Sequence, residues 1–156
     1  MIFLTANPFG CEGDNALRLK SYHGKYITVN ENGTVTADEV KRGPPINVEI
    51  LDGNIIALKD LGSDGKYLHA QDENDGFRIN VQKSRVGPWE KFVVEDHLNG
   101  KVALKTVHGR YFVAEMDGRL IADSGKVDDL EKFSVECVPI THANGRFNKM
   151  RSCSIK

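Results

Sequence analysis

Apolar and polar residues alternate along short runs of the chain, and glycine-containing pairs separate these runs. Leu17 and Leu19 lie in one such run, and Val102 and Leu104 lie in a later one. Alternation with a period of two predicts β-strands with one buried face. The i, i+3, i+4, i+7 apolar spacing of an amphipathic helix is not sustained over any long window. The pattern therefore predicts an all-β protein.

Asn-Gly and Asp-Gly pairs mark the expected turns between strands. Such pairs supply the positive φ angles of a two-residue type I′ turn, which is a common connection in β-hairpins. We therefore expect hairpin turns at seven places. These are Asn32-Gly33, Asp52-Gly53, Asp64-Gly65, Asp75-Gly76, Asn99-Gly100, Asp117-Gly118 and Asn144-Gly145.

The chain also repeats itself. A shift of 85 residues gives nine identities over positions 17–51 without a gap, and the middle third fits the same frame with insertions in its turns. Four apolar positions recur in each third, with spacings of 8, 8 and 13 in the first and third repeats and of 10, 11 and 13 in the second. The positions are Leu19, Ile27, Val35 and Val48, then Leu58, Leu68, Ile79 and Phe92, then Leu104, Phe112, Leu120 and Phe133.

Each repeat thus offers four strands with one principal buried residue apiece, and such a unit cannot bury its apolar face alone. Three units predict a β-trefoil, which is a six-stranded barrel capped by a triplet of hairpins. We expect repeats at about 16–53, 54–98 and 99–138 within a single domain that spans 1–156. A basic C-terminal tail at 139–156 follows the third repeat.

The repeated phrases resemble those of a known family. Leu19-Lys20 with Gly24-Lys25-Tyr26, the parallel Leu104-Lys105 with Gly109-Arg110-Tyr111, and Gly87-Pro88-Trp89-Glu90-Lys91-Phe92 are similar to the fascin-like repeats of actin-crosslinking proteins, hisactophilin included. The resemblance covers residues 16–136. It implies the β-trefoil fold and an actin-binding role, although the phrases themselves are largely structural.

The charge and the cysteine content narrow the range of binding partners and of cellular locations. Twenty-one Lys and Arg against 22 Asp and Glu exclude a strongly basic nucleic-acid binder, whereas the residues from Cys137 onward carry four basic side chains and no acid. No apolar run reaches the ~18 residues of a membrane span, and we expect no secretion signal. Three cysteines cannot all pair, which favours a reducing compartment and an inert thiol at Cys137. The sequence thus predicts a cytoplasmic protein.

No motif for catalysis or for metal or cofactor binding is evident. The cysteines have no neighbouring histidine, and the five histidines lack ligand spacing. His23 and His108 occupy equivalent turns. Two explanations for them are open, that histidine tolerates the backbone conformation of the turn or that these residues sense protons. We therefore expect a non-enzymatic binding protein without a metal or a cofactor.

Actin filaments are the first predicted partner, because basic side chains on a rigid β-surface would meet the acidic face of the filament. Crosslinking by one domain would need two faces or self-association. The candidate contacts are cations in turns, loops and the tail. They are Lys25, Lys66 and Arg110 at corresponding corners, then Lys41, Arg42, Lys83 and Arg85, and then Arg146, Lys149 and Arg151.

Two alternatives remain open. A carbohydrate-binding, lectin-like module is one of them, although the Gln-x-Trp of ricin-type lectins is missing and Trp89 fits a plug at the barrel bottom better than a sugar platform. A protein or membrane-surface role of the tail is the other, with Cys153 as a possible site of modification.

Overall fold

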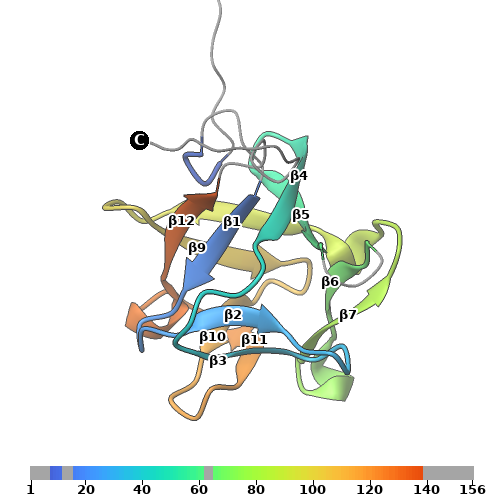
Figure 1. The fold of residues 1–156 in the computed structure, drawn as a ribbon. Helices are drawn as coiled ribbons and strands as arrows, with labels where there is room; N and C mark the ends of the chain where they lie inside the picture. Colours follow the sequence, from blue (N-terminus) through green and yellow to red (C-terminus); the bar gives the residue numbers. More distant parts are fainter. Residues whose placement is uncertain (1–7, 12–15, 62–64, 139–156) are drawn as a thin grey trace, which may run out of the picture.

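The computed structural model describes residues 8–11, 16–61 and 65–138 (Figure 1). Within these ranges lie twelve strands and three one-turn 3₁₀ helices, and no helix there is long and apolar enough to cross a membrane. The strands are β1 (Ala16–Lys20), β2 (Tyr26–Val29), β3 (Val35–Glu39), β4 (Ile46–Asp52), β5 (Ile55–Asp60), β6 (Tyr67–Ala70), β7 (Ile79–Lys83), β8 (Phe92–Asp96), β9 (Lys101–Thr106), β10 (Tyr111–Ala114), β11 (Leu120–Ser124) and β12 (Phe133–Val138). The helices are η1 (Glu73–Asp75), η2 (Pro88–Glu90) and η3 (Asp129–Glu131).

Six of these strands close into a barrel. β1 pairs with β4, β4 with β5, β5 with β8, β8 with β9, β9 with β12, and β12 returns to β1, always antiparallel. A closed barrel has no exposed edge strand, which removes the main route to edge-to-edge aggregation. Each repeat contributes two strands to the barrel, as the sequence predicts.

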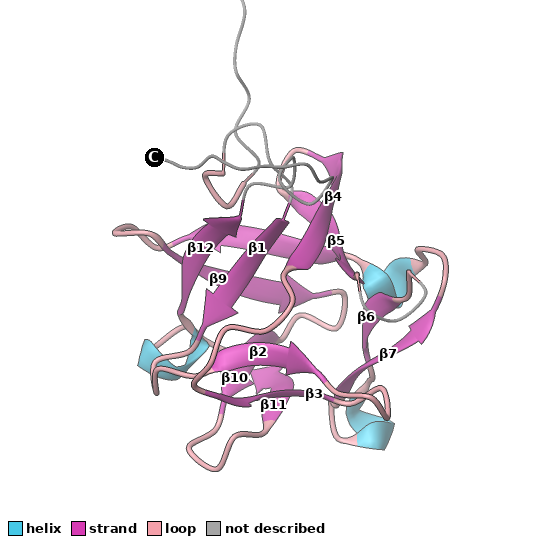
Figure 2. Ribbon diagram, viewed as in Figure 1, coloured by secondary structure: helices cyan, strands magenta, loops and turns pink. Residues whose placement is uncertain are grey.

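The other six strands form three hairpins, β2–β3, β6–β7 and β10–β11, which lie beside one end of the barrel (Figures 1 and 2). Backbone hydrogen bonds of 2.8–2.9 Å link the hairpins in a cycle, because each donates one N–H to the next. The bonds run from Ala37 to Gly118, from Val81 to Gly33 and from Ala122 to Phe77. This arrangement of a barrel and three interlocked hairpins is the β-trefoil.

The twelve apolar positions that define the repeat all lie in the core, which confirms that prediction. Each is 6% exposed or less, and together they form one cluster inside the barrel and under the hairpins. Phe92 and Phe112 meet edge to face, with ring centroids 5.2 Å apart, a favourable geometry for an aromatic pair.

The turn chemistry differs from the prediction. Among the described Asn-Gly and Asp-Gly pairs, only Asn99-Gly100 has two positive φ angles, 56° and 75°. The other described pairs place only the glycine in the left-handed region, so they are not type I′ turns. Phe77, with φ of 55°, takes the left-handed position that Gly33 and Gly118 occupy in the other two repeats.

A disulfide between Cys11 and Cys137 corrects the prediction of an inert thiol at Cys137. Cys11 and Phe9 are buried in the core cluster, so the described segment 8–11 packs against the barrel and is tied to β12. The reason for the correction is that Cys11 lies outside the repeats, 126 residues from its partner. The cytoplasmic location stays a prediction, and the cysteines no longer support it.

A lysine, a tyrosine and a glutamate meet at the same place in each repeat. The tyrosine hydroxyl donates to the carboxylate at 2.6–2.7 Å, and the lysine ammonium lies 5.5–5.6 Å from the centre of the tyrosine ring. The clusters are Lys20–Tyr26–Glu136, Lys59–Tyr67–Glu49 and Lys105–Tyr111–Glu95. Each cluster joins a hairpin to strands of the barrel.

Because of these clusters, we expect the folded protein to lose stability at alkaline pH. Burial and the hydrogen bond to Glu49 raise the pKa of Tyr67 to about 12, and the hydrogen bond to Glu95, together with burial, raises the pKa of Tyr111 to about 12. Since an unfolded tyrosine titrates near pH ~10, the clusters contribute stability that is complete below that pH and is lost as the pH rises through the folded value. We expect the thermal midpoint to fall more steeply between pH ~10 and ~12 for the wild type than for a Tyr67→Phe/Tyr111→Phe variant. Melting curves followed by circular dichroism check this, and parallel curves would contradict it.

Candidate functional site

Three of the predicted cations occupy equivalent corners of the fold. The backbone carbonyls of Lys25, Lys66 and Arg110 each accept a hydrogen bond of 2.7–2.8 Å from the residue that precedes the turn. These donors are Ser21, Asp60 and Thr106, respectively. The three corners are thus related by the pseudo-threefold axis, and they do not converge on one pocket.

Two of the predicted cations, Arg42 and Arg110, make contacts within the protein. The Arg42 guanidinium lies 2.9 Å from the Glu136 carboxylate, and the hydrogen bonds from Arg42 and Tyr26 hold the pKa of Glu136 below its usual range. Arg110 donates to the Asp123 carbonyl at 2.8 Å. Lys41 is exposed, and the candidates Arg146, Lys149 and Arg151 lie outside the described residues.

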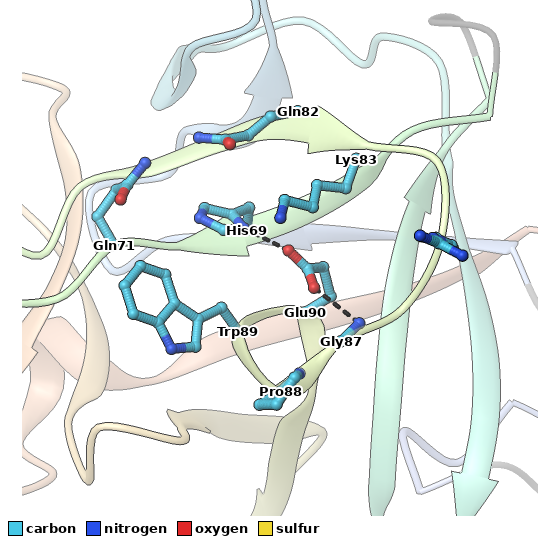
Figure 3. Close-up of a pocket in the computed structure, with 9 residues that line it drawn as sticks. His69, Gln71, Gln82, Lys83, Gly87, Pro88, Trp89 and Glu90 are labelled. Atoms are coloured by element: carbon cyan, nitrogen blue, oxygen red, sulfur yellow. Dashed lines mark hydrogen bonds and ion pairs between the residues drawn. The ribbon is translucent and has the colours of Figure 1, made fainter.

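Lys83 and Arg85 are the predicted cations that the structure places at a pocket. The pocket has a volume of about 510 Å³ and belongs to the second repeat (Figure 3). Strands β6 and β7 form one side, and the loop that leads into η2 forms the other. Gln71, Gln82 and Trp89 line it together with the two cations. It therefore combines an indole ring, two carboxamides and two positive charges.

A buried acid–base pair forms the base of the pocket. Glu90 Oε2 accepts a hydrogen bond from His69 Nδ1, and Glu90 Oε1 accepts one of 2.8 Å from the Gly87 N–H (Figure 3). Glu90 is 2% exposed and His69 is 5% exposed. Because both carboxylate oxygens are used, Glu90 fixes the loop that begins at Gly87 and holds the imidazole ring in place.

Trp89 is half-buried beside the pocket and does not plug the barrel bottom, which corrects that prediction. Its indole lies 5.4 Å from the ring of His69 and 4.9 Å from the ring of His108. His108 is itself fixed, because its Nε2–H donates to the Ala70 carbonyl at 3.0 Å. The indole therefore contacts side chains of two repeats and also lines the pocket.

One feature of the sequence marks this pocket, namely that three of its residues differ in type from their counterparts in the other repeats. Where the second repeat has His69, Gln82 and Trp89, the first has Thr28, Asp38 and Pro45, and the third has Val113, Asp123 and Leu130. These three pocket residues thus depart from the repeat, whereas Glu90 matches Glu131 of the third repeat. No group of three or more His, Cys, Asp or Glu side chains that could hold a metal ion occurs among the described residues.

Comparison with known proteins supports the fold alone. The chain is similar to the crystal structure of a designed threefold-symmetric protein, ThreeFoil, with a TM-score of 0.69 and 19% sequence identity over 78% of this chain and 98% of that one. No protein-family model and no curated protein matches the sequence. The protein is therefore a β-trefoil by its fold, with internal threefold repetition. Its fascin-like character stays a prediction from the sequence motifs.

Proposed function

We propose that the protein is a non-enzymatic carbohydrate-binding module and that its sugar site is the pocket of the second repeat. The observation that carries the proposal is the partly uncovered indole of Trp89 beside the carboxamides of Gln71 and Gln82 in one concavity. An aromatic face stacks on the apolar C–H face of a sugar ring, and carboxamides both donate to and accept from hydroxyl groups. The volume of about 510 Å³ suits a mono- or disaccharide.

The pocket chemistry supports binding over hydrolysis. Cleavage of a glycosidic bond uses two carboxyl groups on opposite sides of the bond. Glu90 is the one carboxylate in the described lining, and both of its oxygens already accept hydrogen bonds from His69 and Gly87. A general acid or base must instead reach the substrate.

Replacement of Trp89 by alanine tests the proposal. We expect a glycan array to identify a ligand of the wild-type protein, and Trp89→Ala to weaken its binding about tenfold or more, as measured by isothermal titration calorimetry. Tyr22→Ala is the matched control, because Tyr22 is an exposed aromatic residue outside the pocket lining. Silence of the wild-type protein across the array would contradict the proposal, as would equal binding by Trp89→Ala.

Actin-filament binding is the second candidate. The observation in its favour is that Lys25, Lys66 and Arg110 repeat a cation at three equivalent corners of a rigid scaffold. Crosslinking of filaments would additionally require a second binding face or self-association. Co-sedimentation with filamentous actin that weakens as salt is raised, together with silence on the glycan array, would favour this candidate over the sugar site.

A further inference from the structure

We propose that the ligand of the second-repeat pocket is an acidic saccharide, whose anionic group is held by Arg85 and Lys83 while its ring stacks on Trp89. This inference rests on the proposed carbohydrate site and names the class of sugar that the site selects. Its basis is the way the charges around the pocket differ from those at the same positions of the other two repeats.

The second repeat replaces acids by an amide and a cation at the pocket rim. In the strand pairing, Lys83 lies opposite Tyr67, as Glu39 lies opposite Tyr26 and Ser124 opposite Tyr111. The residue before each is Gln82 in the second repeat, and it is an exposed aspartate in the other two, Asp38 and Asp123. At these two positions the other repeats therefore carry one or two acids, whereas the second repeat carries a cation and no acid.

Arg85 also lacks an acidic partner like the one that neutralises its counterpart in the third repeat. In the third repeat the equivalent cation, Lys126, lies 3.5 Å from Asp128. The second repeat has Gly87 at the position of Asp128. Within the described part of the chain, neither Arg85 nor Lys83 makes an ion pair, and both are exposed at the pocket. Two positive charges at one concavity then lack an internal counter-charge.

The one acid in the pocket lining does not supply that counter-charge. Glu90 is almost fully buried and has both oxygens occupied by His69 and the Gly87 N–H. Both bonds are made inside the protein, and among the described residues no ion pair joins Glu90 to Lys83 or Arg85. An anionic ligand group would complete the site.

The chemistry of the two kinds of contact explains the selectivity. A guanidinium pairs with a carboxylate through two parallel N–H···O bonds, and a sulfate ester offers the same oxygen geometry. The indole adds affinity only when a sugar ring is attached to that anion. The pocket should therefore prefer an acidic sugar to both a neutral sugar and a simple anion.

Matched sugar pairs test this inference. The methyl glycosides of glucuronic, galacturonic and mannuronic acid differ from those of glucose, galactose and mannose only at C6, and a glucoside 6-sulfate supplies the other anion. We expect the acidic member of at least one pair to bind about tenfold or more tightly than its neutral partner by calorimetry. Trp89 is the only tryptophan of the chain, so a change in its fluorescence places the ligand at this pocket.

Arg85→Gln should bring the affinity for the acidic sugar to within about threefold of that for the neutral one. Lys41→Gln is the matched control, because Lys41 is the exposed cation at the equivalent position of the first repeat. It should leave both affinities unchanged. Unchanged thermal midpoints of both variants would show that the fold is intact.

The outcomes separate the two proposals. Tighter binding of the sulfated glucoside, lost in Arg85→Gln, supports the inference and assigns the anion as a sulfate. Equal binding of acidic and neutral sugars that depends on Trp89 overturns the inference and leaves the proposed function intact. Acetate or inorganic sulfate bound as tightly as the acidic sugars overturns the inference and, if no neutral sugar binds, the proposed function with it.

Discussion

Replacement of Phe112 by alanine is expected to lower the free energy of unfolding by about 3–5 kcal/mol, because the change removes a large side chain from a closed core. Phe112 has no exposed surface, and its ring packs edge to face against Phe92. The barrel and the three hairpins hold the surrounding side chains in place, so the cavity cannot collapse freely. Urea denaturation of the variant and the wild type measures the difference.

Met116→Ala is the control for this change. Met116 is 81% exposed in the β10–β11 turn, and we expect its replacement to change the stability by less than about 0.5 kcal/mol. A cost of less than about 1 kcal/mol for Phe112→Ala would contradict the core position of that side chain.

Glu90→Ala is expected to be the second large effect, with a cost of about 3–5 kcal/mol. The change leaves two groups without an acceptor, the buried His69 Nδ1–H and the partly buried Gly87 N–H. The third repeat provides a matched control in Glu131, which accepts from the Asp128 N–H at 2.7 Å. We expect Glu131→Ala to cost about 1 kcal/mol, since it removes a single hydrogen bond.

A double-mutant cycle isolates the contribution of the imidazole. Val113 occupies in the third repeat the position that His69 has in the second, so His69→Val reproduces the surroundings of Glu131. In that background, Glu90→Ala should cost about as much as Glu131→Ala. If Glu90→Ala costs the same with and without His69, the histidine contributes nothing to the buried pair.

The core of this fold is readable from the sequence because the same spacing recurs three times. Leu19, Leu58 and Leu104 are each fully buried at the same point of the first strand of their repeats. A single alternating run is ambiguous, but three in register fix which face turns inward. The insertions in the second repeat did not disturb this prediction, since they fall in turns.

The repeat pattern predicts neither the disulfide nor the turn types. Cys11 precedes the first repeat and lies 126 residues from Cys137, so no local pattern connects the two residues. An Asn-Gly or Asp-Gly pair indicates a turn, but the strand register around it decides whether one or both residues take a positive φ. Phe77 shows the limit of such rules, because a position that favours glycine holds a phenylalanine there.

The candidate site was predicted only in part. The sequence predicts Lys83 and Arg85 as partner-binding cations of turns and loops, but nothing in their sequence neighbourhood places them beside Trp89 and the buried pair. His69 and Glu90 are 21 residues apart and come from a strand and a 3₁₀ helix. Their contact depends on how η2 packs on β6, which the repeat pattern does not specify because the other repeats lack the histidine.

The bond between Cys11 and Cys137 makes most of the molecule a covalent ring. The ring includes every strand from β1 to β11 and nearly all of β12. A single proteolytic cut in any turn within it would therefore linearise the ring without releasing a fragment. The ring also survives unfolding, so the denatured chain stays more compact and has less entropy to gain, which favours the native state.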